Sequence, residues 1–268
     1  MPHVLLSIAC HAYASAAIAY LAYLVRPWRL FPIAARFLVG SGLVLHAIAL
    51  VTAFSGQGGM PQGILQGLSV LAFLLLSILL ALEIRYRIPV MGALLTPIAV
   101  AILVPPLVIG GGANSLPNAF PRPLLPLHIS VALLGLAAFG VAAGVALMYL
   151  LMDRQMKGKH FGVLFSRLPS LRFLDELNRL LVVWGFVALS VTLITGAFFA
   201  GHGFFWAWDS KEIATVVAWG IFAALLTARF FAGWQGRRVA VLTMAGFCLL
   251  LISFFTSYNA EQYRGLFH

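Results

Sequence analysis

The sequence predicts an all-helical integral membrane protein: a bundle of eight transmembrane helices with both termini on the periplasmic side. Hydrophobic residues make up 62% of the chain and its mean hydropathy is +1.02, more apolar than ordinary soluble domains. Apolar runs of spanning length, about 20 residues, recur along the whole chain. Lys and Arg are concentrated in alternate connections between these runs, the distribution that sets membrane topology.

The apolar runs define the predicted helices, because an unpaired backbone group in lipid costs several kcal/mol and each span must satisfy its own hydrogen bonds. The connections between the runs are short. We therefore interpret residues 1–268 as a single polytopic membrane domain. Its predicted spans lie near residues 4–25, 34–54, 63–82, 89–108, 127–152, 178–200, 212–231 and 239–259.

Basic residues predict the orientation of these spans. With the amino terminus outside, 14 of the 17 Lys and Arg residues face the cytoplasm, and only Arg122, Lys211 and Arg264 lie outside. This asymmetry predicts a multi-pass protein of a bacterial inner (plasma) membrane. It also explains the net charge of +10 as topology in a lipid bilayer, so no nucleic acid partner is expected.

Two segments depart from simple spans. The inner connection between residues 153 and 177 mixes apolar and basic residues around Pro169, which is typical of an interfacial amphipathic segment or of a solvated basic loop. The fourth run contains Pro97, Pro105 and Pro106, which predict a kinked or broken outer half.

The stretch at 201–212 is the most polar and aromatic part of the outer side. It places three charges and four aromatic residues in twelve positions between two apolar runs. Charges beside aromatic rings at a span boundary indicate a ligand platform, although tryptophans also anchor membrane proteins at the headgroup level. Glu212 begins the seventh span, where an acidic side chain favours the helix dipole.

The seven histidines offer candidate ligands. His11 and His46 lie about eight residues below the outer ends of their spans, roughly 12 Å deep at the helical rise. His128 opens the fifth span after an outer loop. A neutral imidazole is a standard axial ligand of haem iron. A histidine within a span is also a common partner in hydrogen bonds between helices, so the residues alone leave both roles open.

Two motifs resemble those of a known family. The stretch Trp206-Ala207-Trp208-Asp209-Ser210-Lys211-Glu212 follows Ile194-Thr195-Gly196-Ala197 and precedes Trp219 and Arg229. It resembles the tryptophan-rich WWD region of the cytochrome c assembly proteins, the CcsA, CcmC and HemX-like membrane proteins. Leu127-His128-Ile129-Ser130 is similar to the segment that supplies a periplasmic haem ligand in that family. The size and span count are most similar to the short HemX and YpjD type.

The resemblance implies a haem-binding membrane protein that holds or presents haem at the periplasmic face during cytochrome c assembly. It implies that His128 is an axial metal ligand and that His46 is a transmembrane metal ligand or relay. The remaining cofactor-binding residues that it implies lie in the aromatic loop. They are Trp206 and Trp208 for stacking on the porphyrin, Asp209 for loop geometry and Lys211 for a propionate. His202 stands in place of the motif's first tryptophan and is a further candidate for binding the cofactor.

One departure from the family pattern concerns the second axial ligand. Thr256 stands where the resemblance leads us to expect another periplasmic histidine, and a threonine does not ligate iron as imidazole does. Either the iron is five-coordinate, or His202 substitutes, or this branch has another assembly or regulatory role.

No pair of nucleophile and base is evident, so independent catalysis is not expected. The resemblance implies a haem chaperone or a subunit of a haem-attachment complex. Its partners would be apocytochrome c and a second membrane-bound protein with a periplasmic domain. The alternative is a non-haem membrane transporter or an accessory or scaffold factor with the same fold, in which the aromatics anchor the chain and the histidines bond between helices.

Overall fold

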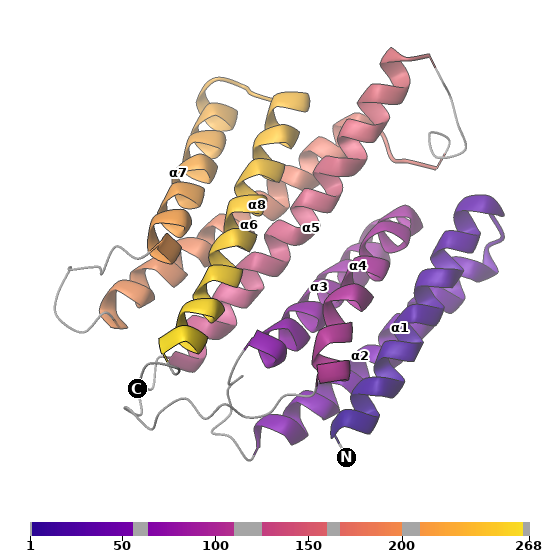
Figure 1. Cartoon of the computed structure of the whole chain (residues 1–268). Coiled ribbons are helices and arrows are strands. Elements are labelled where there is room, and N and C mark those ends of the chain that lie inside the picture. Colours follow the sequence, from indigo (N-terminus) through magenta and orange to yellow (C-terminus); the bar gives the residue numbers. More distant parts are fainter. Residues whose placement is uncertain (1, 56–63, 110–124, 160–166, 200–209, 265–268) are drawn as a thin grey trace. The chain divides into compact units, whose positions relative to one another are not determined.

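The structure, a computed structural model, describes residues 2–55, 64–109, 125–159, 167–199 and 210–264 (Figure 1). Within these ranges all regular secondary structure is α-helical. The helices are α1 (Pro2–Val25), α2 (Leu30–Phe54), α3 (Ile64–Tyr86), α4 (Pro89–Ile109), α5 (Leu125–Lys157), α6 (Leu171–Phe199), α7 (Ser210–Phe231) and α8 (Arg237–Arg264).

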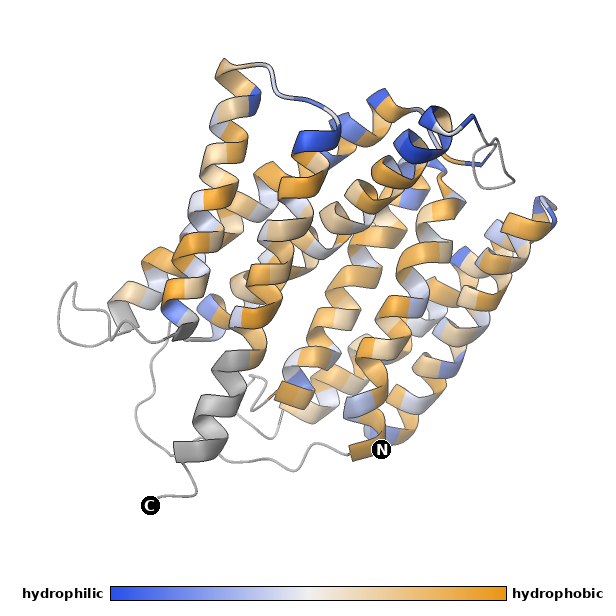
Figure 2. Cartoon of the chain, turned by 45° about the horizontal axis from the view of Figure 1, so that its top comes forward, coloured by the Kyte–Doolittle hydropathy of each residue, from blue (hydrophilic) through white to orange (hydrophobic). Residues whose placement is uncertain are grey.

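All eight of these helices are long and apolar enough to cross a membrane, which confirms the predicted all-helical membrane fold. Figure 2 shows apolar colouring along most of each helix and the strongest hydrophilic colouring near helix ends. Large apolar side chains such as Phe37, Val104 and Trp184 are exposed. Lipid can cover such side chains, whereas water would leave this much apolar surface unfavourably solvated.

The described chain divides into two compact units. The first unit contains α1 to α4, in which α1 packs against α2 and α4, and α3 packs against α2 and α4. The buried face of α1 repeats every three or four residues, as expected for one face of a helix. That face comprises Leu6, Ala9, Cys10, Tyr13, Ala16, Ala17 and Tyr20.

Two glycines let tyrosines of α1 enter the first unit. Gly42 of α2 lies against the Tyr13 ring, and a Cβ there would stand 2.5 Å from Tyr13 Cε1. Gly92 of α4 lies against the Tyr20 ring in the same way, with a virtual Cβ 2.6 Å from ring atoms. Both tyrosines are completely buried, so their rings fill the space that the missing side chains leave.

A buried acid lies at the end of the first unit where α3 ends. The Glu83 side chain is 1% exposed, and the Tyr20 hydroxyl donates a hydrogen bond to its Oε2. Arg36 of α2 places its Nε 3.7 Å from Glu83 Oε1. Acidic side chains in membrane helices are costly unless paired, and this one combines a hydrogen bond with an ion pair.

The second unit contains α5, up to Asp153, together with α6, α7 and α8. The rings of Phe139 on α5 and Phe222 on α7 stack with centroids 3.9 Å apart. Gly135 of α5 faces α6, where a Cβ would stand 3.1 Å from the Ala188 Cβ. Small residues at such crossings allow membrane helices to approach closely.

A polar network joins four elements of the second unit. Arg229 Nη2 on α7 lies 2.6 Å from Asp175 Oδ2 on α6, and its Nη1 donates to Asn178 Oδ1 at 3.3 Å. The other Asp175 oxygen accepts the backbone N–H of Gly236, which has a φ of +78° and precedes α8. Asn178 Nδ2 donates to the Ala142 carbonyl of α5. The network therefore links all four helices of the unit.

This network accounts for a difference from the sequence-based prediction. Helix α6 begins at Leu171, well before the span predicted from residue 178, so the residues after Ser170 are helical rather than a loop. The Ser170 Oγ accepts the Phe173 N–H at 3.3 Å, as a helix N-cap does. Asp175 and Asn178 interrupt the apolar pattern of the sequence, yet both face polar partners inside the unit.

Helix α4 contains the three prolines that predict a kinked or broken outer half. It continues without a break from Pro89 to Ile109, through Pro97, Pro105 and Pro106, so the broken outer half is not found. A proline removes one N–H from the helix, but packing against neighbouring helices allows membrane helices to tolerate it. Pro106 is itself buried in the first unit.

Candidate functional site

His128 lies in the first turn of α5, and its side chain is part-buried. Its Nδ1 lies 2.7 Å from the Oγ1 of Thr195, near the carboxyl end of α6. The neighbouring Gly196 faces the imidazole edge, where a Cβ would stand 3.3 Å from His128 Cε1. The end of α6 therefore holds the ring by a hydrogen bond and makes room for it at the next residue.

Aromatic and polar side chains also make contacts closer to the amino end of α6, in the same unit. Trp219 Nε1 on α7 donates to Ser190 Oγ at 3.0 Å, and its ring stacks on Phe186 at a centroid distance of 5.5 Å. On the α7–α8 side, the hydroxyls of Thr215 and Ser253 lie 2.6 Å apart. These contacts fix α7 and α8 near the half of the unit that carries His128.

His46 has a different environment in the first unit. The residue is completely buried on α2, and its Nε2 lies 2.9 Å from Ser69 Oγ. Its Nδ1 lies 3.3 Å from the Tyr13 hydroxyl. Both ring nitrogens thus have partners within the unit, and iron coordination by His46 would require one of them to move away. Its role as a metal ligand stays a prediction.

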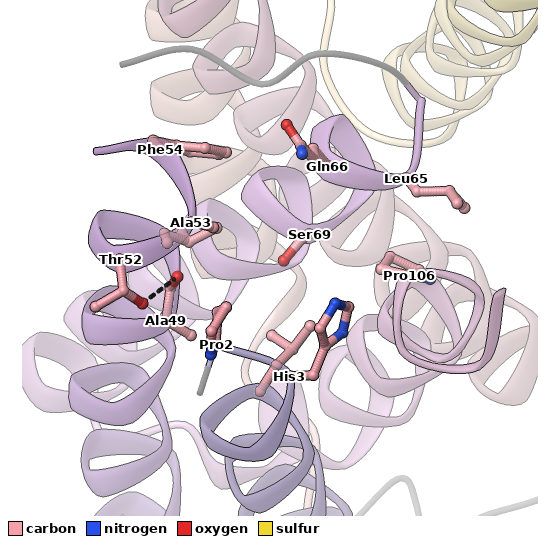
Figure 3. A pocket seen from close by; sticks show the side chains of 12 residues that line it. Pro2, His3, Ala49, Thr52, Ala53, Phe54, Leu65, Gln66, Ser69 and Pro106 are labelled. Atoms are coloured by element: carbon pink, nitrogen blue, oxygen red, sulfur yellow. Dashed lines mark hydrogen bonds between the residues drawn. The ribbon is translucent and has the colours of Figure 1, made fainter. Parts of the chain in front are cut away.

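A cavity of about 230 Å³ lies beside Ser69 in the first unit (Figure 3). It is bordered by the ends of α1, α2, α3 and α4, including His3, Thr52, Gln66 and Pro106. Cofactor pockets usually have volumes of about 300–1,000 Å³, so this space is smaller than a site for an extended planar ring. His46 itself does not line this cavity, so the cavity does not test its role as a ligand.

His11, the other histidine predicted within a span, has no partner from another helix in the contacts that follow. Its side chain is exposed on α1, and its Nδ1 bonds to the Ser7 carbonyl 2.7 Å away in the same helix. This is a local hydrogen bond within the helix, on a face that the rest of the first unit does not cover. The structure thus separates two histidines that the sequence placed at equal depth, because only His46 lies on a buried face.

The remaining predicted residues fall in or beside the aromatic loop. His202, Trp206, Trp208 and Asp209 lie outside the described residues, and the side chain of Lys211 does too. Within the described parts of the chain, no group of three or more His, Cys, Asp or Glu side chains is placed to hold a metal ion.

Two residues at these histidines were not predicted as their partners from sequence. Thr195 was noted only as part of a motif, and Ser69 carried no pattern of its own. A threonine or serine hydroxyl within a helix usually bonds to a carbonyl one turn earlier, as Thr195 also does with the Val191 carbonyl. Only the packing of α5 on α6 brings His128 to it.

The fold and these contacts define a multi-pass helical membrane protein with a histidine fixed where a span begins. A sequence profile of the family described as "Cytochrome C assembly protein" matches residues 35–262, so the chain belongs to that family. This confirms the resemblance seen in the motifs.

Individual relatives agree with the family match. "Cytochrome c biogenesis protein CcsA" of Prochlorococcus marinus is 29% identical over 250 residues, which cover 82% of this chain and 79% of that protein. "Inner membrane protein YpjD" of Escherichia coli is 29% identical over 227 residues, which cover 82% and 83% respectively.

A solved structure has a similar fold. "Cytochrome c Heme Lyase CcmF" matches with a TM-score of 0.69 at 16% identity, over 96% of this chain. The match covers 49% of the CcmF chain, so this protein spans about half the length of that structure. At this identity the likeness concerns the fold alone.

Proposed function

We propose that this protein binds haem and holds or presents it for cytochrome c assembly, at the periplasmic face of a bacterial inner membrane. The observation that carries the proposal is the seating of His128: a part-buried imidazole at the start of a span, bonded through Nδ1 to Thr195. A haem iron takes such an imidazole as an axial ligand through the other ring nitrogen. Membership of the cytochrome c assembly family supports the same function.

The aromatic loop would complete this site. Trp206 and Trp208 would stack on the porphyrin, Asp209 would hold the loop, and Lys211 would pair with a propionate. His202 is the candidate for the second axial position, since Thr256 stands where the family motif leads us to expect a histidine. The chain's own residues would bind and orient haem, and its charged loop would mark the outer face.

Partners follow from this role. The described connections between helices are short, so positioning apocytochrome c would fall to a second membrane-bound protein with a periplasmic domain. The relatives named as biogenesis proteins support a place in such an assembly. In this proposal the protein supplies binding and orientation, the contributions that proximity makes to a reaction.

The test is the absorption spectrum of the full-length protein, purified in detergent from haem-replete cells. We expect a Soret band for the wild type, and we expect His128→Ala to lose most of it because the described axial ligand is gone. Trp206→Ala should weaken the band by removing a stacking face. His11→Ala is the matched control: it removes an exposed imidazole and should leave the band unchanged.

The outcomes separate the proposed function from its alternative. A wild-type protein that takes up no haem, and is unaffected by His128→Ala, would contradict haem binding and favour a transporter or scaffold role. A band that survives His128→Ala but disappears in His46→Ala would move the haem to the first unit. A change from a six-coordinate to a five-coordinate spectrum in His202→Ala would identify the second ligand.

A further inference from the structure

We infer that Thr195 is a positioning residue for His128: its hydroxyl oxygen accepts the Nδ1–H of the imidazole, so that Nε2 keeps its lone pair for the iron. This inference rests on the proposed function and adds a residue outside the aromatic loop. It starts from the distances around one oxygen atom. It concerns which ring nitrogen of His128 carries the proton, a question that haem binding alone does not answer.

Thr195 Oγ1 has three close neighbours. It lies 2.8 Å from the Val191 carbonyl and 3.1 Å from the Thr192 carbonyl, both on its own helix. It lies 2.7 Å from His128 Nδ1 on α5. A threonine hydroxyl has a single proton but two lone pairs, so it cannot donate to the helix and to the histidine at once.

Two arrangements of protons are then possible. In the first, the hydroxyl proton is shared by the two helix carbonyls, and His128 donates its Nδ1–H to the oxygen. In the second, the hydroxyl donates to Nδ1, and both short contacts with carbonyl oxygens have no proton between them. The first arrangement satisfies all three contacts, and back-bonding to carbonyls three and four residues earlier is usual for threonine in helices. It places the imidazole proton on Nδ1.

Gly196 leaves room for the ring edge in this arrangement. The ring atom nearest to it is Cε1, the carbon between the two nitrogens, and a Cβ at position 196 would stand 3.3 Å away. That distance is shorter than ordinary contact, so any side chain there would push the ring edge. Thr195 thus holds one nitrogen, and Gly196 leaves room for the adjoining ring edge.

The chemical consequence is a ligand prepared for metal. A histidine that donates its second N–H to an oxygen is held in one tautomer and orientation, and its coordinating nitrogen becomes more basic. Loss of such a partner typically lowers metal affinity by about 10–100-fold. We therefore expect haem affinity to depend on Thr195 although Thr195 does not touch the iron.

The experiment compares three full-length variants in detergent. Thr195→Val removes the acceptor and keeps the shape, whereas Thr195→Ser keeps the hydroxyl. Thr192→Val is the matched control, because Thr192 lies one turn earlier on α6 and its hydroxyl bonds to the Ala188 carbonyl. Haem titration should show a loss of affinity of about 10–100-fold for Thr195→Val, with rescue in Thr195→Ser and wild-type affinity in Thr192→Val.

A second measurement works without haem. Nitrogen-15 NMR of the apoprotein labelled at histidine, assigned with His128→Ala, reports which nitrogen of His128 carries the proton at a pH where the ring is neutral. We expect the Nδ1–H form in the wild type and in Thr195→Ser, and a mixture of both forms in Thr195→Val.

Each result has a distinct meaning. An Nε2–H tautomer in the wild-type apoprotein would overturn the inference, as would unchanged haem affinity in Thr195→Val. A protein that shows the Nδ1–H form but binds no haem would contradict the proposed function and leave the hydrogen bond in place. If Thr195→Val does not fold, the tautomer of the wild-type apoprotein decides the question.

Discussion

Replacing Arg229 with Ala is expected to destabilise the protein by about 3–5 kcal/mol, the usual cost of removing one partner of a buried ion pair. The Arg229 and Asp175 side chains are 3% and 14% exposed, so Asp175 would be left as a nearly buried charge. Asn178 Oδ1 and the Asp175 carbonyl would also lose a donor. The measurement is the free energy of unfolding in mixed detergent micelles.

The matched control is Arg172→Ala, which lies on the same helix as Asp175. Arg172 forms an ion pair with Glu176 one turn away, and both side chains are largely exposed. Such a pair contributes only about 0.3–0.5 kcal/mol. Equal effects of the two substitutions would contradict the importance of the buried network.

A double-mutant cycle tests whether the pair acts as a unit. We expect Asp175→Ala to be nearly as costly as Arg229→Ala, because it leaves the guanidinium without its carboxylate and the Gly236 N–H without an acceptor. The double variant should then cost less than the two single effects added together, since residues in one network are not additive. Strict additivity would show that the contact is incidental.

Gly42→Ala is expected to destabilise the first unit by about 1–3 kcal/mol, the usual range for overpacking a core. The new Cβ would lie 2.5 Å from Tyr13 Cε1 and 2.9 Å from Cδ1, closer than any real contact. Tyr13 is completely buried and bonded to His46, so the ring cannot turn away without loss. The expected result runs against helix propensity, by which alanine is favoured over glycine.

Gly40→Ala is the control for this substitution. Gly40 lies on the same helix, and its Cβ would meet only Leu80 Cδ2, at 3.9 Å. We expect unfolding free energy to stay the same or to rise by up to about 1 kcal/mol, from helix propensity alone.

A second substitution identifies the cause. In the Gly42→Ala background, Tyr13→Leu should restore part of the stability because the ring is gone. Tyr13→Phe should not, because the clash involves ring carbons rather than the hydroxyl. Rescue by Tyr13→Phe would contradict the steric explanation.

Much of this protein was predictable from the sequence. Apolar runs of spanning length specify helices in lipid irrespective of their neighbours, since each helix satisfies its own backbone. The motifs around His128 and the aromatic loop predicted the family, which the profile match over residues 35–262 confirms. The orientation of the termini and the roles of the loop residues remain predictions.

Other features could not be predicted from the sequence because they depend on contacts between residues that are distant along the chain. Asp175 falls in the predicted inner connection, and Asn178 begins the span predicted from residue 178. In the structure they continue α6, because Arg229 on α7 and Thr243 on α8 supply their partners. The three prolines of α4 suggested a kinked or broken outer half, and the helix continues through all three without a break.

The histidines also separate what the sequence determined from what only the tertiary structure decided. Composition and helical periodicity determined that the chain spans the membrane and that His11, His46 and His128 lie on or near its spans, because hydrophobicity and helix rise are local properties. Only the tertiary structure decided what each imidazole contacts. His11 faces outward, His46 is bonded to Tyr13 and Ser69, and His128 is held by Thr195. A side chain's partners depend on which helix faces pack together, and no local pattern specifies that packing.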